Sequence, residues 1–515
     1  MKSEMMPYTV KAEYRNQIIP EYQGNPLIEA LPDIWSTEHV IGMLSDKAAY
    51  NNGERKLDIQ YRLHCIHRLF RYFQPLEQHI DIEQRISRSI RQGYLGRNPL
   101  MPEYARGMAD GFAVMKDKGS YSMIPGMKTA ASGFTIIGVS GVGKSTAVEK
   151  ILSLYPQRII HARYKEEPLA LTQLVWLKLD CPHDGSLKQL CYQFFHVLDM
   201  AAGTDYFQQY TKGRYALDML LIIMTQLVRQ FQIGILVIDE IQHLSEAKGG
   251  GSDKMLNFFV TLVNTIGVPV VMIGTTKAMS ILQGEFRQAR RGSGQGDLIW
   301  DRMGNDAAWN VFVKSMWRYQ WTGKNVAYTD ELANVLYDES QGIIDIAIKL
   351  YAIVQIDAIT NGKEDFSAPD IRKAAEKKLG LVKPMLDALR SGDKKRILKY
   401  EDITPVNIED YLSAYKAVKT EVQEKTTEQK LTVLEQTSIK LMEVGVDPAM
   451  ARRLAGKVLA SHKNPISVGE AFKEAYRLYI AEDTSMPAED MPGDIRNNDG
   501  YAGFRQSGAI DDMEW

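Results

Sequence analysis

The chain has 515 residues, of which 45% are hydrophobic and 24% are charged, and its formal net charge is −2. This length allows two or three domains with a large core. The near-zero charge excludes a global attraction to nucleic acid or to an anionic membrane, so any DNA contact has to come from a local patch. The three cysteines show no zinc or disulfide spacing. No apolar run of about 18 residues predicts a membrane span, so we expect a cytoplasmic protein with no membrane partner.

The first hundred residues predict an N-terminal extension, residues 1–100, made of an arm and helices. Residues 1–55 are mixed in composition and include NPLIEALP, a Pro-bounded apolar patch that we interpret as part of an arm. In IDIEQRISRSIRQGY the isoleucines recur at nearly helical spacing, which predicts a helix ending at Gly93. The sequence GYLGRNP then predicts a loop.

An alternation of apolar strands and helices begins at Phe134, within a region that we delimit as residues 101–325. The expected strands are FTIIG (134–138), LVWLKLD (174–180), IGILVIDE (233–240) and VPVVMIGT (268–275). The expected helices are Lys144 to about Leu154, then 186–201, 214–231 and 254–266. Such alternation is typical of a parallel sheet covered by helices on both faces, so the predicted class is α/β.

Beyond residue 325 the sequence predicts helices only. ELANVLYDES, IIDIAIKLYAIVQIDAIT and APDIRKAAEKKLG are three expected helices of a region that spans residues 326–400. Residues 401–481 have amphipathic helical patterning, with PAMARRLAGKVLASH as the clearest helix. Residues 482–515 are acidic and contain little core material, so we expect a disordered tail.

A phosphate-binding loop follows the first strand of the α/β region. The stretch from Gly138 to Ser145 matches GxxxxGK[ST] in full. Its glycines let backbone N–H groups face phosphates, Lys144 can reach the β- and γ-phosphates, and Ser145 can hold Mg²⁺. The helix that begins here adds its positive N-terminal dipole. ATP and Mg²⁺ are therefore the expected cofactors.

An acidic pair, Asp239 and Glu240, ends the apolar strand ILVID. Asp239 can support the Mg²⁺ ion, and Glu240 can polarise the attacking water as a general base. The pair favours hydrolysis over phosphoryl transfer to a small molecule, although an acidic pair at an ordinary strand end is the alternative. The residues expected to bind nucleotide are Gly138, Ser140, Gly141, Gly143, Lys144, Ser145, Thr146 and Asp239. Two of them, Ser145 and Asp239, are the expected metal residues.

Two further elements resemble parts of AAA+ ATPases. The strand VPVVMIGT ends in Thr275, which can sense the γ-phosphate or orient water, unless it simply caps the strand. EFRQARRGSGQG carries Arg287, Arg290 and Arg291 at an expected helix end. An AAA+ protomer inserts such an arginine into its neighbour's ATP site, and the sequence leaves Arg290 and Arg291 both open, with a solvated basic face as the alternative.

The helical region 326–400 corresponds in this comparison to the AAA+ lid. Many AAA+ lids carry a phosphate-sensing arginine shortly after a glycine. This chain has Asp345 at the place where that arginine is expected after Gly342. The absence of an arginine there predicts slow hydrolysis, which suits a timer or switch better than a motor.

Longer blocks of sequence resemble TnsC, the AAA+ regulator of TnsABC-type transposons (the TnsC/TniB family). They are GVSGVGKST, LKLDCPHDGSLKQLC, LVIDEIQHLSEAKGGGSDKMLNFFVTLVNTIGVPVVMIGT, ARRGSGQG and ESQGIIDIAIKLY, with NPLIEALP and GYLGRNP nearer the N-terminus. The resemblance extends over roughly residues 15–400, and the long block around Asp239 is far more specific than a phosphate loop alone.

The resemblance implies a bacterial protein that acts on DNA in the cytoplasm. TnsC proteins bind ATP, assemble as rings or filaments around duplex DNA, and link a target-selecting protein to the transposase. The implied partners are further copies of this chain, TnsA and TnsB, and a TnsD/TniQ-type protein, in some systems attached to a CRISPR effector complex. ATP turnover then disassembles the ring or filament, which we call the collar.

The resemblance also indicates where DNA is contacted, in segments after the second strand and before the long apolar helix. The candidates in this chain are Lys188, Thr211, Lys212 and Arg214, with exposed loop cations of no DNA role as the alternative. Such contacts to phosphates are largely independent of sequence and sensitive to salt. Because each subunit of a ring repeats these contacts, a few cations per protomer suffice for DNA binding despite the net charge of −2.

Two other functions remain open at this point. One is a related AAA+ adaptor, such as a helicase loader or an insertion-sequence helper, which would bind DNA and ATP but not TnsA or TnsB. The other is a signalling or pathogen-sensing P-loop ATPase, which would show no ATP-dependent retention on DNA.

Overall fold

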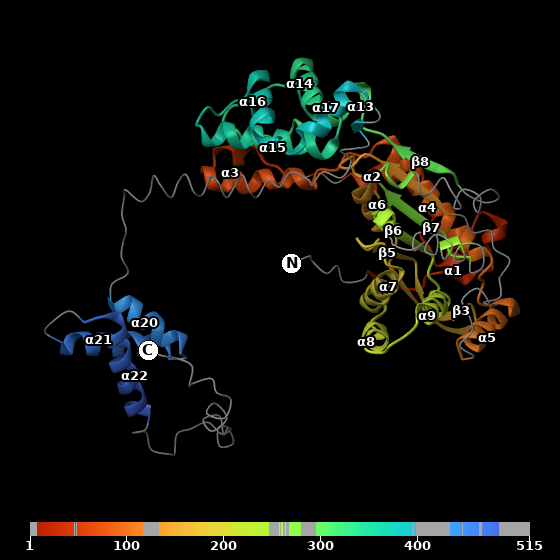
Figure 1. The fold of residues 1–515 in the computed structure, drawn as a ribbon, viewed down its shortest axis with the longest axis horizontal. Helices are drawn as coiled ribbons and strands as arrows, with labels where there is room; N and C mark the ends of the chain where they lie inside the picture. The colour runs from red at the N-terminus through yellow and green to blue at the C-terminus, as the bar shows by residue number, and fades with distance from the viewer. Residues whose placement is uncertain are drawn as a thin grey trace. The chain divides into compact units, whose positions relative to one another are not determined.

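The computed structural model describes residues 8–45, 47, 49–116, 133–246, 257, 259–260, 263, 267–279, 295–393, 396–397, 433–444, 446–462 and 466–483. The chain divides into two compact units, Met1–Ile408 and Glu409–Trp515 (Figure 1). The first unit contains the phosphate loop and all of the candidate site residues.

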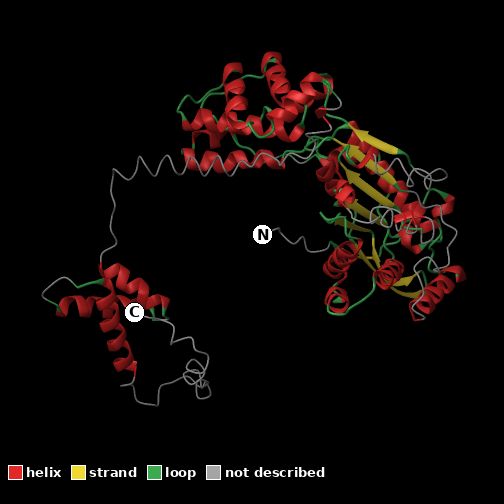
Figure 2. Ribbon diagram, in the orientation of Figure 1, coloured by secondary structure: helices red, strands yellow, loops and turns green. Residues whose placement is uncertain are grey.

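A parallel sheet of five strands forms the centre of the first unit (Figure 2). Its strands are β2 (Phe134–Gly138), β5 (Trp176–Asp180), β6 (Ile235–Asp239), β7 (Val270–Gly274) and β8 (Asp297–Trp300). They are arranged in the order β5-β6-β7-β2-β8, and every neighbouring pair is parallel. The prediction of a parallel sheet is confirmed. The edge strand β8 is short and is not among the predicted strands.

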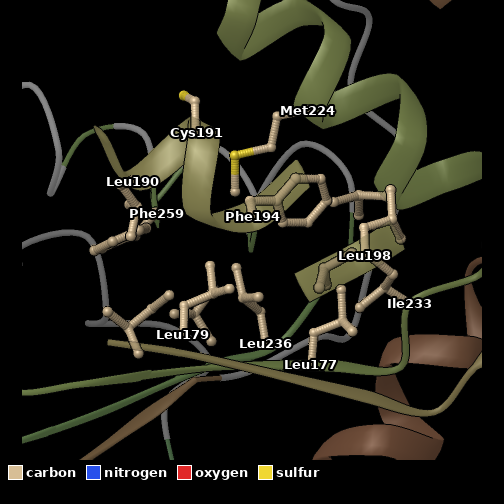
Figure 3. Close-up of a cluster of buried hydrophobic side chains, with 14 of the residues drawn as sticks. Leu177, Leu179, Leu190, Cys191, Phe194, Leu198, Met224, Ile233, Leu236 and Phe259 are labelled. Carbon is tan, nitrogen blue, oxygen red and sulfur yellow. The ribbon is translucent and has the colours of Figure 1, made fainter. Parts of the chain in front are cut away.

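Helices cover both faces of this sheet, as predicted. On one face, α7 (Leu187–Ala202) and α9 (Leu217–Gln230) pack against leucines of β5 and β6, and Figure 3 shows Leu177, Leu179 and Leu236 below Phe194 and Leu198. The other face has α6 (Lys144–Leu152), which contacts α4 (Glu77–Leu95). The apolar strands need both layers because neither face of the sheet can be left in water.

A second, smaller sheet joins the N-terminal segment to this unit. Its strands are β1 (Thr9–Lys11), β3 (Arg158–Tyr164) and β4 (Glu167–Leu174), in the order β1-β3-β4. The predicted strand 174–180 is wrong in its start, because Leu174 ends β4 and β5 begins at Trp176. The hairpin of β3 and β4 was not predicted, because neither strand is a continuous apolar run like the strands of the central sheet.

The apolar patch NPLIEALP lies in the core of the first unit. It forms the short helix α1 (Pro26–Glu29), and Leu27, Ile28 and Leu31 are completely buried. The Asn25 side chain caps α1 and donates a 2.8 Å hydrogen bond to the carbonyl of Tyr94, the penultimate residue of α4. The remaining N-terminal elements are η1 (Pro20–Tyr22), α2 (Thr37–Leu44), η2 (Asn52–Lys56), α3 (Ile59–Ile66), η3 (His67–Arg71) and α5 (Pro102–Lys116).

The helical region after β8 consists of α13 (Ala307–Met316), α14 (Asp330–Ser340), α15 (Ile344–Thr360), α16 (Ala368–Lys378) and α17 (Lys383–Ser391). The three helices predicted between residues 330 and 380 are therefore confirmed. Their core includes the buried Trp309, Trp317 and Tyr351. The N-terminal segment supports this region, since α3 and η3 contact α15 (Figure 1).

The second unit has three described helices, α20 (Val433–Glu443), α21 (Pro448–Ser461) and α22 (Val468–Asp483). They enclose a core of their own that includes Leu441, Leu454 and Val458, and α21 confirms the predicted helix. The expected tail lies outside the described residues except for its first two positions, which end α22. Most of the expected helix at 254–266 also lies outside them. Among the described helices, none is both long and apolar enough to cross a membrane.

Candidate nucleotide site

The phosphate loop connects the end of β2 to the start of α6. Gly141 and Gly143 have φ angles of +82° and +99°, a left-handed conformation that only glycine adopts without strain. Such a turn directs successive N–H groups to one side and creates an anion-binding concavity. At Gly138 a β-carbon would lie 1.9 Å from the carbonyl oxygen of Trp300, so the glycine also lets β8 approach the loop.

Lys144 lies within the loop and is 8% exposed. Its Nζ donates to the carbonyl oxygens of Gly138 and Val139, both at 2.9 Å. A buried ammonium needs such partners, and phosphate oxygens can take their place. Ser145 and Ser140 are partly exposed and Thr146 is exposed on the same turn. The loop therefore fits a triphosphate with a hydroxyl available for Mg²⁺.

Asp239 is the last residue of β6 and is 3% exposed. Its Oδ1 accepts the Glu240 N–H at 2.9 Å, and its Oδ2 lies 3.1 Å from Nζ of Lys178 on β5. Lys178 also contacts Asp180 and Glu149. Burial by itself lowers the pKa of Lys178, but Asp239, Asp180 and Glu149 together outweigh it and raise that pKa. The ammonium therefore stays charged beside Asp239.

Glu240 and Thr275 are connected through Gln242. The Gln242 amide donates to the Glu240 carboxylate, and its carbonyl oxygen accepts the Thr275 N–H at 3.1 Å. Glu240 is exposed and has a φ angle of +57°, which is uncommon for a residue with a side chain. Thr275 is 5% exposed, and its buried hydroxyl finds no hydrogen-bond partner among the described residues. This hydroxyl is therefore available to donate a hydrogen bond to a phosphate or to a water.

The order of the strands brings these groups together. The loop after β2, Thr275 after β7 and Asp239 at the end of β6 follow three neighbouring parallel strands, with β7 in the middle. Because parallel strands end at the same edge, the three groups lie side by side at the carboxyl edge of the sheet, where α/β sheets bind ligands.

A cavity of about 270 Å³ lies beside the loop. Its walls combine aromatic and aliphatic side chains with a few polar groups: Phe70, Tyr72, Phe73, Gln74, His79, Phe312, Ile344, Asp345, Ile348 and Lys349. A mostly apolar slot next to phosphate-binding N–H groups suits a nucleobase. Two larger hollows, of about 660 and 480 Å³, are lined by residues of α14 to α17 and the adjoining loops, and include none of the phosphate loop.

The sequence reading did not identify this cavity. Its N-terminal wall is RLFRYFQP, and an aromatic cluster just before a helix was the available signal. His79 is buried against Phe73 and Trp300, with ring centroids 4.7 and 5.3 Å away. Burial lowers the pKa of His79 to about 4, so the ring is neutral at physiological pH. A neutral imidazole keeps this wall free of charge.

The start of α15 reaches the phosphate loop. The Asp345 N–H donates to the Gly141 carbonyl at 3.2 Å, and the Asp345 carboxylate pairs with Lys349 at 2.7 Å. The position expected to carry an AAA+ lid arginine therefore contacts the loop, and it carries an acid. Lys349 is a cation of α15 that lines the cavity.

The remaining predicted residues lie elsewhere or outside the described chain. Arg287, Arg290 and Arg291 fall in 280–294, outside the described residues. Lys188 is exposed in the first turn of α7, with Nζ 5.7 Å from the ring centroid of Tyr192. The candidates Thr211, Lys212 and Arg214 are at and just after the end of α8 (Tyr206–Thr211), which packs on α7. These four belong to the layer that covers the sheet face opposite α6.

One contact connects the segment that precedes Lys188 to the acidic pair. His183 follows β5 and His243 lies in η5 (Ile241–Glu246), directly after Gln242. Their rings approach each other, with Nδ1 of His183 3.0 Å from Nε2 of His243. This contact connects the segment after β5 to the segment after β6.

The chain was compared with protein families and with solved structures. Residues 128–282 match the family model of the AAA domain. No curated protein matches the chain. Similar solved structures include Aeropyrum pernix ORC1 in complex with DNA (12% identity, 74% of this chain and 84% of that chain, TM-score 0.36). Another is Drosophila ORC bound to DNA (10% identity, 86% of this chain and 90% of that chain, TM-score 0.33). A third is the Thermotoga maritima RuvB Holliday junction branch migration motor (14% identity, 61% of this chain and 93% of that chain, TM-score 0.30).

The strand order, the phosphate loop and the family match agree with one another. The sheet places β6 and β7 between the loop strand β2 and the strand β5, and the matched residues 128–282 include Lys144, Asp239 and Thr275. The loop fits a triphosphate, and a helical region contacts it through Asp345. The chain therefore has the AAA+ P-loop fold, with a five-stranded parallel sheet flanked by helices and a helical part after it.

Proposed function

We propose that this chain is a slow ATPase that assembles on duplex DNA and recruits a transposase, as a regulator of the TnsC type. One observation supports the ATPase part most strongly: the orphaned Thr275 hydroxyl lies between the phosphate loop and the Asp239–Glu240 pair. A sheet edge with a loop for phosphates, an acid for Mg²⁺, a base and an unsatisfied hydroxyl between them suits nucleotide hydrolysis.

Each side chain has a distinct part in this proposal. Lys144 exchanges its two loop carbonyls for phosphate oxygens, and Ser145 with Asp239 holds Mg²⁺, which neutralises charge on the phosphates. Thr275 donates its hydroxyl to the γ-phosphate or to the attacking water. Glu240 accepts the proton of that water, and Gln242 orients Glu240. The apolar cavity beside the loop holds the base.

Slow turnover follows from the lid in this proposal. The lid residue over the loop is Asp345, whose negative charge is partly balanced by Lys349. A carboxylate next to the phosphates does not stabilise developing negative charge as an arginine would. The trans arginine, Arg290 or Arg291, would complete the site only after assembly. Hydrolysis then acts as a timer for an assembled collar.

The DNA-binding part of the proposal rests on the sequence resemblance and on exposed cations of one layer. Lys188 is exposed at the start of α7, and Lys212 and Arg214 are exposed after α8. Phosphate contacts of this kind lose affinity by orders of magnitude between ~50 and ~200 mM salt when six or more phosphates are engaged. We propose TnsA, TnsB and a TnsD/TniQ-type protein, in some systems with a CRISPR effector, as further partners on the same grounds.

The first experiment images the full chain by negative-stain electron microscopy with duplex DNA, with and without a non-hydrolysable ATP analogue. We expect rings or filaments on DNA only when nucleotide is present. Lys144→Ala should abolish this assembly, and Glu240→Gln should assemble with ATP but fail to disassemble. Dispersed particles under all conditions would contradict the collar. Pull-downs with TnsA and TnsB then separate this function from that of a helicase loader, which should capture neither.

A further inference from the structure

Both oxygens of the Asp239 carboxylate are occupied by groups of the protein itself. Oδ1 accepts the Glu240 N–H at 2.9 Å, and Oδ2 is 3.1 Å from Lys178 Nζ. The Asp239 side chain is 4% exposed, so water hardly reaches it. A carboxylate that is this buried needs a counter-charge, and Lys178 supplies it.

Strand register explains why Lys178 can reach Asp239. Parallel pairing aligns Lys178 with Val237 and Asp180 with Asp239. Aligned residues of neighbouring strands point to the same face, and alternate residues of one strand share a face, so the side chains of Lys178, Asp180 and Asp239 lie on one side of the sheet. Leu177 and Leu179 point to the other side, into the apolar cluster of Figure 3.

The same ammonium also contacts the helix that follows the phosphate loop. Lys178 Nζ is 3.0 Å from Glu149 of α6 and 3.3 Å from Asp180. One cation thus lies among three carboxylates on α6, β5 and β6. The side chain of Lys178 is only 17% exposed, whereas those of Glu149 and Asp180 are about half exposed or more. Water can therefore screen Glu149 and Asp180 much better than it can screen Asp239.

These contacts have a consequence for Mg²⁺. A divalent ion supported by Asp239 needs the negative charge that Lys178 already neutralises, and it is repelled by the ammonium at short range. The triphosphate adds several negative charges next to Ser145, so nucleotide and Mg²⁺ together can overcome this repulsion. Mg²⁺ alone lacks that contribution.

We propose that Lys178 is the resting counter-ion of Asp239 and makes Mg²⁺ binding beside Asp239 dependent on nucleotide. Lys178 is a positioning residue in this proposal, because it acts on the ion through Asp239. The inference rests on the ATP–Mg²⁺ site proposed above and extends it to the order in which the ion and the nucleotide bind.

The test measures the melting temperature of the nucleotide-free full chain during a Mg²⁺ titration at constant ionic strength. The wild type should respond little to Mg²⁺. Lys178→Met should melt at a lower temperature than the wild type in EDTA, and its melting temperature should recover as Mg²⁺ is added. The Mg²⁺ concentration that gives half of this recovery should be about tenfold lower than the concentration that gives half of the wild-type response. Lys178→Arg, which keeps the charge, should behave like the wild type. A Lys178→Met protein with the wild-type Mg²⁺ response would overturn the proposal.

Two controls separate this role from a structural one. Lys314→Met removes an exposed lysine of α13 and should leave the Mg²⁺ response unchanged. If Lys178→Met alone does not fold, the double variant Lys178→Met/Asp239→Asn should fold again and show no Mg²⁺ response, because the buried charge is gone. A double variant that is no more stable than Lys178→Met would also overturn the proposal.

Nucleotide binding by the wild type is measured in parallel. Failure of the wild type to bind ATP with Mg²⁺ would refute the proposed ATP site itself. Normal binding together with an unchanged Mg²⁺ response in Lys178→Met would refute only the role of Lys178.

Discussion

Gln242 holds the carboxylate of Glu240 with its side-chain amide, and the same side chain accepts the backbone N–H of Thr275. The amide group of Gln242 thus connects Glu240, the candidate general base after β6, to Thr275, the candidate phosphate sensor after β7. Gln242 is 7% exposed, so this connection is shielded from water. Gln242 therefore bonds to both residues in the conformation that the structure shows.

Replacing Gln242 tests whether this connection orients the base. Gln242→Leu keeps the approximate volume but removes both hydrogen bonds. We expect kcat for ATP hydrolysis to fall about tenfold, equivalent to about 1.4 kcal/mol, with little change in KM, because binding contacts remain. Steady-state phosphate release measures both constants. Gln230→Leu, at an exposed glutamine of α9, is the matched control. An increase in kcat would instead mean that Gln242 restrains Glu240 in an inactive position.

Burial of His79 predicts that acid destabilises the first unit. The pKa of His79 is lowered to about 4 from an ordinary value of 6.5, since burial disfavours the imidazolium. As pH falls from about 6.5 to about 4, the unfolded chain takes up a proton that the folded chain does not, so stability decreases in this window. The shift of about 2.5 units corresponds to about 3 kcal/mol when complete.

Urea unfolding at a series of pH values measures the contribution of His79. In the wild type, Nδ1 of His79 accepts a 2.7 Å hydrogen bond from the Leu76 N–H. In His79→Gln the glutamine can accept this hydrogen bond, and its side chain does not titrate. Its stability should therefore fall less between pH 6.5 and 4 than that of the wild type. His39→Gln, at an exposed histidine of α2, should not alter the profile. Identical profiles for His79→Gln and the wild type would contradict this prediction.

The ion pair of Arg62 and Glu364 connects the N-terminal segment to the helical region. The guanidinium of Arg62 contacts both carboxylate oxygens, at 2.6 and 2.8 Å, and also the Trp321 carbonyl. Glu364→Gln leaves the Arg62 side chain, which is only 7% exposed, without its counter-charge. We expect a loss of about 2 kcal/mol in the free energy of unfolding, below the range for fully buried pairs because Glu364 is partly exposed.

The pH dependence of this pair has a definite sign. The hydrogen bonds from Arg62 lower the pKa of Glu364 below its ordinary value of 4.5. The stabilisation is therefore complete above about pH 4.5 and is lost as pH falls through the lower, folded-state pKa. Lys324→Met, which removes an exposed partner of Asp365, should change stability by less than about 0.5 kcal/mol. Equal effects of Glu364→Gln and Lys324→Met in thermal unfolding would refute a special role of the Arg62 pair.

The apolar cavity predicts a specific effect on nucleobase binding. Phe73 lines the cavity and is only partly buried, so Phe73→Ala removes an aromatic wall with limited loss of core packing. We expect ATP affinity to fall about tenfold, in line with the contribution of one aromatic contact, while the affinity for inorganic triphosphate stays the same. Isothermal titration with both ligands distinguishes the two effects. Phe112→Ala on α5 is the control at an exposed position. A parallel loss for both ligands would place the base elsewhere.

Much of the fold followed from local patterns. The glycine-rich loop, the apolar strands around it and the amphipathic helices are each encoded within short stretches, and the structure confirms the parallel sheet and the helical region between residues 330 and 380. The short edge strand β8 and the β3–β4 hairpin were not predicted, because β8 has only four residues and neither β3 nor β4 is a continuous apolar run. The assigned roles of the candidate site residues stay predictions until they are tested.

The sequence by itself determined the chemistry that depends on spacing along the chain. Lys144 follows its glycines directly and Glu240 follows Asp239, so these pairs are recognisable without a fold. Only the tertiary structure decided which distant side chains meet them. Lys178 reaches Asp239 through the register of two strands, Gln242 reaches Thr275 across the edge of the sheet, and Phe73 and Ile348 face one cavity because the helical region lies over the loop. Register and packing are set by the burial of all the apolar faces together, and for that reason no local pattern contains them.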